Sequence, residues 1–170
     1  DRPEDLELVH EYDQKPTLEF LIGELYNTDF GRCYLATQTI LNLYREEAPE
    51  AVLATYAEQA HDDYGAHYHV MKLLGWLKYT PSYDLIVEAL HNQQPQFNKS
   101  RAAAAIALAN LGDERVISLL KELLDTPIFE LKYASLLALE QLGDNSIWEM
   151  VAEDVNLLIR EKAASKLAVI

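Results

Sequence analysis

The sequence predicts an all-α protein built as a solenoid of about five helix pairs. Two segments, beginning at Ala107 and Ala138, share the pattern Ala-Leu-x-x-Leu-Gly-Asp and lie 31 residues apart. A period of that length is typical of stacked helical repeats. No segment alternates between polar and apolar residues for long enough to indicate a β-strand. We therefore expect an elongated stack of helices whose core runs along the stack.

The first helix of each pair is marked by apolar residues at positions i, i+3, i+4 and i+7, which form one face of a helix. These patterns start at positions 18, 53, 83, 116 and 147. Pro16, Pro49 and Pro81 precede three of them, and a helix start tolerates proline because its first amides have no helical partner. We expect first helices near 16–27, 49–60, 81–92, 113–125 and 145–154.

A second helix is expected after each first helix, near 31–46, 64–79, 99–111, 130–142 and from 156 to the end. Gly112 and Gly143 follow the last apolar residue of two of these helices, where a left-handed glycine can close a helix. Asp113 and Asp144, which come next, can cap the following helix. The predicted repeats, 16–46, 49–79, 81–111, 113–142 and 145–170, form a single domain over 1–170.

Part of the chain resembles the HEAT repeat family. The residues that carry the resemblance are Leu131-Lys132, Ala134, Ala138-Leu139 and Leu142-Gly143-Asp144, with their counterparts between Arg101 and Asp113. More narrowly, they are similar to the short class found in bilin-lyase subunits of phycobilisome assembly. The match is looser over 16–79, where the Gly-Asp pair is missing.

The resemblance implies a right-handed α-α superhelix and, by family habit, a scaffold that binds another protein. The alternative that it implies is a subunit of a bilin lyase or isomerase, or a phycobiliprotein chaperone. Because the same short repeats occur in many unrelated scaffolds, the resemblance does not establish lyase activity.

Charge and composition exclude several classes of function. The chain carries 28 acidic and 14 basic residues, a formal net charge of −14, which disfavours nucleic acids and anionic membranes as partners. Its apolar runs are shorter than the ~20 residues that cross a bilayer. The single cysteine, Cys33, fits a small buried side chain and a reducing compartment. We expect a cytoplasmic protein whose partner carries a basic surface.

The motifs favour a binding protein over an enzyme. The sequence has no Gly-x-Ser-x-Gly elbow, no phosphate-binding loop and no His-Glu-x-x-His helix. His61, Asp62, Asp63, His67 and His69 are possible metal ligands, but His67 and His69 are two residues apart and point to nearly opposite sides of a helix. We therefore expect no catalytic residue, no cofactor and no metal site.

Four cationic or imidazole side chains recur near the start of successive second helices. Each is expected to meet a residue at the end of the preceding first helix and so to tie the repeats together. The expected pairs are His67 with Asp63, Arg101 with Asn92, Lys132 with Asp125, and Arg160 with Asp154.

The second-helix face is the candidate binding surface, because second helices line the inner side of such a superhelix. Six of the ten tyrosines lie between residues 44 and 83. Large aromatic side chains with a polar tip are typical of binding hot spots. We predict that the partner protein contacts one row of residues on this face: Tyr68, Lys72, Trp76, Ile106, Tyr133 and Leu137.

The last helix is apolar where a solenoid end should be polar. Its apolar residues include Ile159, Ala163, Leu167, Val169 and Ile170. We expect either that more protein follows, or that this end contacts a companion subunit or a second copy of the chain.

Overall fold

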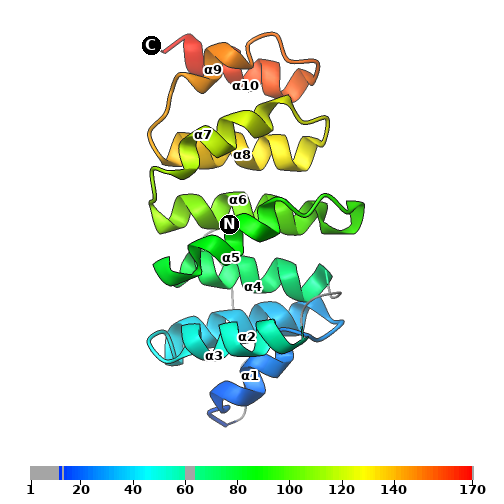
Figure 1. Cartoon of the computed structure of the whole chain (residues 1–170), viewed down its shortest axis with the longest axis vertical. Helices are drawn as coiled ribbons and strands as arrows, with labels where there is room; N and C mark the ends of the chain where they lie inside the picture. The colour runs from blue at the N-terminus through cyan, green and yellow to red at the C-terminus, as the bar shows by residue number, and fades with distance from the viewer. Residues whose placement is uncertain (1–11, 13, 60–63, 170) are drawn as a thin grey trace.

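The structure, a computed structural model, describes residues 12, 14–59 and 64–169, and within these residues it contains helices and no strand. The prediction of an all-α solenoid is confirmed. First and second helices alternate along the chain and the pairs succeed one another along the long axis (Figure 1). The pairs are α1 (Leu18–Glu24) with α2 (Phe30–Leu43), α3 (Ala48–Gln59) with α4 (Tyr64–Trp76), α5 (Tyr83–Leu90) with α6 (Asn98–Leu111), α7 (Val116–Glu122) with α8 (Phe129–Gln141), and α9 (Ile147–Met150) with α10 (Leu157–Leu167).

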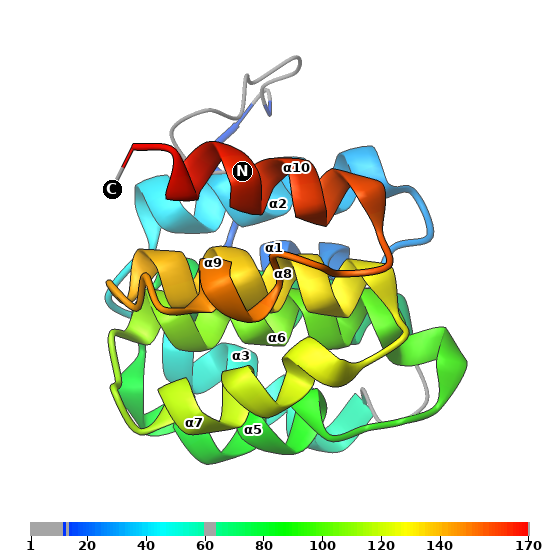
Figure 2. The ribbon, with the colours of Figure 1, turned by 90° about the horizontal axis from the view of Figure 1, so that it is seen from above.

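The second helices form the spine of the stack. Helix α6 packs between α4 and α8, and α5 and α7 lie to one side of this layer (Figure 2). The core runs through successive second helices, with fully buried Leu74 on α4, Leu108 on α6 and Leu139 on α8. Burying a large aliphatic side chain stabilises a fold by about 1.5–3 kcal/mol, so this continuous apolar column holds the repeats together.

Small residues let α4 and α6 approach closely. A Cβ atom added to Gly75 would lie 2.7 Å from the Cα of Ala107, which is closer than carbon atoms can pack. Ala103, Ala104 and Ala107 on the facing side of α6 are also buried. The two helices therefore meet almost backbone to backbone at Gly75 and Ala107.

Helix ends follow the predicted chemistry at several positions. Gly112 and Gly143 adopt φ angles of 73° and 86°, the left-handed conformation that glycine allows without steric cost. The amide of Arg115 donates to Asp113 Oδ1 at 2.9 Å, and that of Ser146 donates to Asp144 Oδ1 at 3.1 Å. The two glycines therefore end one helix as predicted. The expected caps by Asp113 and Asp144 are wrong: these aspartates shape the turn, but the N-cap residues of α7 and α9 are Arg115 and Ser146.

Several helices are shorter than predicted, and two of them show why. Pro81 lies in a 3₁₀ turn, Thr80–Ser82, so α5 begins only at Tyr83. The first helix expected near 145–154 is reduced to the single turn of α9, because the chain leaves the helical conformation at Val151, whose φ and ψ are −111° and 11°.

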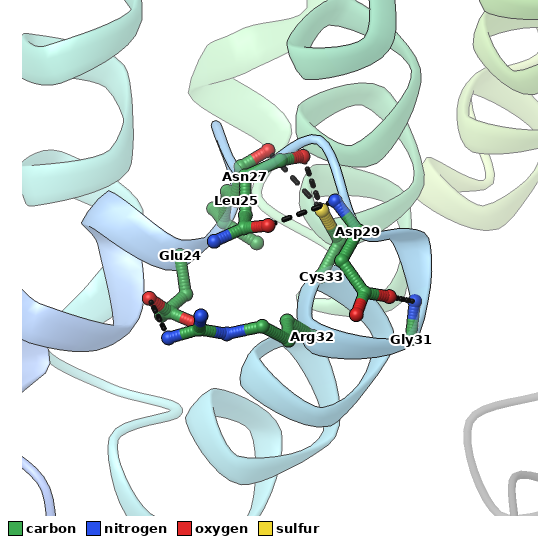
Figure 3. Close-up of polar contacts among 7 residues, drawn as sticks. All are labelled: Glu24, Leu25, Asn27, Asp29, Gly31, Arg32 and Cys33. Atoms are coloured by element: carbon green, nitrogen blue, oxygen red, sulfur yellow. Dashed lines mark hydrogen bonds and ion pairs between the residues drawn. The ribbon is translucent and has the colours of Figure 1, made fainter.

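The turn between α1 and α2 is closed by polar contacts (Figure 3). Arg32 binds the carboxylate of Glu24 through two nitrogens, at 2.7 and 2.9 Å. Asp29 Oδ1 accepts from the amide of Gly31 at 2.9 Å and caps α2. The thiol of Cys33 is fully buried and donates to the carbonyls of Asn27 and Leu25, which confirms that it is a small buried side chain.

The predicted ladder of contacts at the starts of the second helices is wrong in two of its partners, those of Lys132 and Arg101. Lys132 pairs with Asp154 of the following repeat at 2.7 Å, and not with Asp125 of its own repeat. The reason is geometric: Asp125 is exposed, whereas Asp154 is held close to the buried Lys132 amine.

The other three side chains of the ladder contact backbone carbonyls or a tyrosine hydroxyl, and not a carboxylate or amide side chain. Arg101 Nε donates to the backbone carbonyl of Leu90 at 2.7 Å, and not to the expected Asn92. Arg160 donates to the backbone carbonyl of Asp154 at 3.1 Å. His67 forms a hydrogen bond with the hydroxyl of Tyr56 on α3. Its expected partner, Asp63, lies outside the described residues, as do His61 and Asp62.

The described residues bear on two classes of function that the sequence disfavours, metal binding and membrane insertion. No group of three or more His, Cys, Asp or Glu side chains converges in that part of the chain. None of the helices described is both long and apolar enough to span a bilayer. Leu157 and Leu158 at the start of α10 are exposed apolar residues. The predicted contact of this helix with a companion subunit or a second copy of the chain stays a prediction.

Candidate binding groove on the second-helix face

A groove of about 370 Å³ lies over the contact between α4 and α6 and reaches the start of α8. This volume falls in the range of small-molecule sites in proteins, about 300–1,000 Å³. Its walls combine aromatic, aliphatic and charged side chains. The lining residues are Tyr68, Lys72, Trp76, Lys99, Ala102, Ala103, Ile106, Ala107, Asn110, Glu130 and Ala134.

The floor of the groove is low because the residues beneath it are small. Ala102, Ala103 and Ala107 line it from α6, and Gly75 packs against Ala107 from α4. Tyr68, Lys72 and Trp76 line the groove from α4. Trp76 is only 8% exposed, so it presents one edge to the groove and buries the rest of its ring.

Lys72 is enclosed by three aromatic rings. Its Nζ lies 5.2, 5.1 and 5.0 Å from the ring centroids of Tyr34, Tyr68 and Trp76. The amine also donates to the Tyr68 hydroxyl at 3.2 Å. Burial lowers the pKa of the Lys72 amine, although interaction with Tyr34 acts in the opposite direction. The rings therefore position a partly desolvated cation at the groove wall.

The aromatic wall continues from α4 onto α2. The Tyr34 and Tyr68 hydroxyls lie 3.4 Å apart, and Phe30 stacks on Tyr68 with ring centroids 6.4 Å apart. Burial and the hydrogen bond to Tyr68 raise the pKa of the Tyr34 hydroxyl, so it stays protonated at neutral pH. The buried ring of His69 contacts Phe30, Tyr34 and Tyr68 edge-on and fixes the base of this wall.

Two further charges stand at the far side of the groove. Lys99, on the first turn of α6, and Glu130, on the first turn of α8, are both lining residues. They occupy equivalent positions in successive second helices. The groove thus holds two amines against one carboxylate, which is a local excess of positive charge in a chain of formal charge −14.

The structure brings together four of the six residues that the sequence singled out. Tyr68, Lys72, Trp76 and Ile106 all line the groove, whereas Tyr133 and Leu137 do not. Tyr133 instead stacks on Phe129 and lies below Lys162 of α10, one repeat further along. The predicted row therefore divides between two neighbouring places on the second-helix face.

The sequence reasoning missed Tyr34, Lys99 and Glu130. Tyr34 lies 34 residues before Tyr68, close to the repeat period, so extending the row backwards by one repeat would have found it. Lys99 and Glu130 sit two residues before Arg101 and Lys132, the recurring cations. Their shared register was visible, but only the packing of α6 against α8 shows that they border the same groove.

The groove offers several kinds of contact to a ligand. Amines, aromatic rings and a small-residue floor can hold a flat molecule that carries carboxylates, through charge-assisted hydrogen bonds and ring contacts.

Comparison with known proteins places the chain among related sequences. A family model described as HEAT repeats matches residues 95–168. A Pseudanabaena tenuis protein with the name "uncharacterized phycocyanin operon protein Y" is 61% identical over 97% of this chain and 39% of its own length. The "bilin biosynthesis protein CpeY" of Synechococcus sp. strain WH8020 is 32% identical over 94% of this chain and 42% of its own length. The chain spans about two fifths of both curated relatives.

Proposed function

Because this chain belongs to the HEAT-like repeat family, we propose that it acts in bilin biosynthesis as a binding segment that holds a linear tetrapyrrole in the groove between α4 and α6. One relative has bilin biosynthesis in its name, and the other is named for a phycocyanin operon. Since the chain spans only part of these relatives, the proposal assigns it a binding role and no catalytic step.

The chemistry of the groove supports this ligand. A bilin is a conjugated chain of four pyrrole rings with two propionate carboxylates. Lys72 and Lys99 offer amines to those carboxylates, and the exposed edges of Tyr68 and Trp76 with the Ile106 side chain offer apolar contact to the rings. The observation that carries the proposal is the enclosure of the Lys72 amine by three aromatic rings at the groove wall.

Absorbance tests the proposal directly. Titrating the protein with biliverdin is expected to shift and sharpen the visible band of the pigment, because a groove restricts its conformations. Lys72→Met and Lys99→Met are each expected to weaken binding about tenfold, since each removes one carboxylate contact. Lys121→Met on α7 is the matched control, because Lys121 does not line the groove and pairs instead with Asp144 at 2.8 Å.

Fluorescence provides a second reading of the same site. The chain has two tryptophans, Trp76 at the groove and the buried Trp148. In a Trp148→Phe variant, a bound tetrapyrrole is expected to quench the remaining Trp76 emission. A visible spectrum and a Trp76 emission that both stay unchanged at saturating biliverdin would contradict the proposal.

A second candidate function is a protein-only adaptor that binds an acceptor through the second-helix face. It is favoured by the continuation of apolar and aromatic side chains past the groove to Phe129, Tyr133 and Leu137. Capture of phycocyanin apoprotein on immobilised chain separates the two candidates. Capture that persists in Lys72→Met and Lys99→Met, with no pigment binding by the unaltered chain, would favour the adaptor.

A further inference from the structure

A second cluster of lysines and aromatic rings lies on the second-helix face between α8 and α10. Lys162 Nζ is 5.7 Å from the ring centroid of Tyr133 and 5.9 Å from that of Trp148. Lys166 Nζ is 5.6 Å from the Trp148 ring. We name the surface formed by Phe129, Tyr133, Leu137, Lys162 and Lys166 the α8–α10 patch.

The patch has an accessible apolar part. Phe129 is 39% exposed and stacks on Tyr133 with ring centroids 5.6 Å apart and planes at 29°. Tyr133 and Leu137 are half-buried on the same helix, one turn apart. Trp148, by contrast, is fully buried and supports the patch from below. Aromatic residues grouped in this way are typical of the energetic centre of an interface.

The charge of the patch is positive. Lys166 is paired with Glu140 at 2.7 Å, which neutralises one of the two amines. Within the part of the chain that the structure describes, no carboxylate lies within ion-pair distance of Lys162. Lys162 is half-buried over two rings, so its charge is held in place and is available to an incoming group.

Local charge decides what this patch can bind. The Debye length at physiological salt is about 8 Å, so contact partners respond to the nearest charges more than to the net charge of the chain. A basic segment placed on the patch would meet Lys162 without compensation. An acidic segment would pair with Lys162 while its apolar side chains pack on Tyr133 and Phe129.

We propose that the α8–α10 patch docks an acidic segment of a partner protein, with a carboxylate on Lys162 and apolar side chains on Tyr133 and Phe129. The expectation of a basic partner, which rests on the net charge of −14, stays a prediction for the remaining surface. A partner that meets both expectations has an acidic segment for the α8–α10 patch and a basic surface around that segment. This inference does not depend on tetrapyrrole binding in the groove.

The probe is a fluorescein-labelled peptide in which glutamate alternates with leucine and tyrosine, measured by anisotropy with the unaltered chain. We expect saturable binding that weakens with added salt. Replacing every glutamate in the peptide with glutamine, which keeps size and apolar content, is expected to reduce affinity at least tenfold. Absence of binding, or equal binding of both peptides, overturns the proposal.

Protein variants locate the contact. Lys162→Met is expected to weaken peptide binding about tenfold, and Lys162→Arg to retain most of it, because the charge and the ring contact remain. Lys121→Met, another half-buried lysine, serves as the matched control, and circular dichroism checks that each variant keeps its helical content. Unchanged binding by Lys162→Met overturns the proposal.

Lys72→Met distinguishes this patch from the groove between α4 and α6. We expect it to leave peptide binding unchanged while it weakens biliverdin binding. If Lys72→Met weakens peptide binding as much as Lys162→Met does, the peptide occupies the groove and the α8–α10 patch is rejected. Failure of biliverdin to bind, with peptide binding intact, removes only the proposed tetrapyrrole function.

Discussion

Lys132 on α8 forms an ion pair with Asp154, beyond the end of α9, with Nζ and Oδ2 2.7 Å apart. The two side chains are only 11% and 8% exposed. The pair therefore links two successive repeats through a largely buried contact, next to the single-turn helix α9.

Removing the carboxylate of this pair is expected to destabilise the fold. Asp154→Asn leaves the Lys132 amine buried without a counter-charge, and breaking such a pair costs on the order of 3 kcal/mol. Asp125→Asn is the matched control, because Asp125 is exposed and does not contact Lys132. Urea unfolding of the two variants measures the difference. Equal free energies of unfolding would show that the pair contributes nothing.

The same pair predicts a pH dependence. Burial pushes the pKa of Asp154 upward, but hydrogen bonds from Lys132 and the Asn156 amide outweigh it, so the pKa lies below its ordinary 3.8. A lowered pKa stabilises the fold above pH 4 or so, and this contribution disappears as the pH falls through the folded-state pKa. The stability difference between unaltered chain and Asp154→Asn should therefore shrink below about pH 4. A difference that stays constant would argue against an ionised pair.

Close approach of α4 and α6 depends on Gly75. Gly75→Ala places a methyl group 2.7 Å from the Ala107 Cα and 2.8 Å from its Cβ, so the helices must separate. We expect the free energy of unfolding to fall by about 1–3 kcal/mol, which is typical of overpacking, and ligands of the groove to bind more weakly. Gly23→Ala in α1 is the control: nothing lies within 4 Å of the added Cβ, and alanine favours helix by about 1 kcal/mol. Thermal denaturation should give shifts of opposite sign.

The left-handed glycine at the end of α6 permits a purely conformational test. No atom lies within 4 Å of a Cβ added to Gly112, but its φ of 73° is unfavourable for alanine. Gly112→Ala should lower the free energy of unfolding by about 1–2 kcal/mol. Gly112→Asn should lower it less, because asparagine tolerates the left-handed conformation. Denaturant unfolding of both variants shows which of them is the more stable. An alanine variant as stable as the asparagine variant would contradict this account.

Removing both aromatic walls of the groove tests the sequence-derived row. Trp76 is mostly buried, so an alanine there would damage the core, and we choose Trp76→Phe together with Tyr68→Ala. The double variant is expected to retain its helical content and to bind biliverdin or the partner protein at least tenfold more weakly. Tyr133→Ala, outside the groove, should leave biliverdin binding unchanged. Unaltered ligand binding in the double variant would remove Tyr68 and Trp76 from the site.

Much of the fold was predictable because its determinants are local. The apolar face of each helix and the left-handed glycines depend on residues within a few positions of one another. Asp154, in contrast, was assigned to Arg160, although its carboxylate faces Lys132. Both residues carry suitable charge, and only the packing of consecutive repeats decides between them.

The candidate site was predictable only in part for a similar reason. Tyr68, Lys72 and Trp76 share one face of α4, so helical spacing alone groups them. Tyr133 belongs to the same repeat position as Tyr68, yet Phe129 and Lys162 draw it into a separate cluster. Residues at equivalent repeat positions line one groove only if the side chains of the helix between them are small. A repeat pattern does not contain that information.

The brevity of α9 has a consequence for how the stack opens. In a linear array each repeat is stabilised mainly by its neighbours, so a repeat with one helical turn on its outer side has the lowest local free energy of opening. Amide protons of α10 should therefore exchange with deuterium sooner than those of α6, which is enclosed by α4 and α8. A ligand that bridges α8 and α10 would slow this local opening.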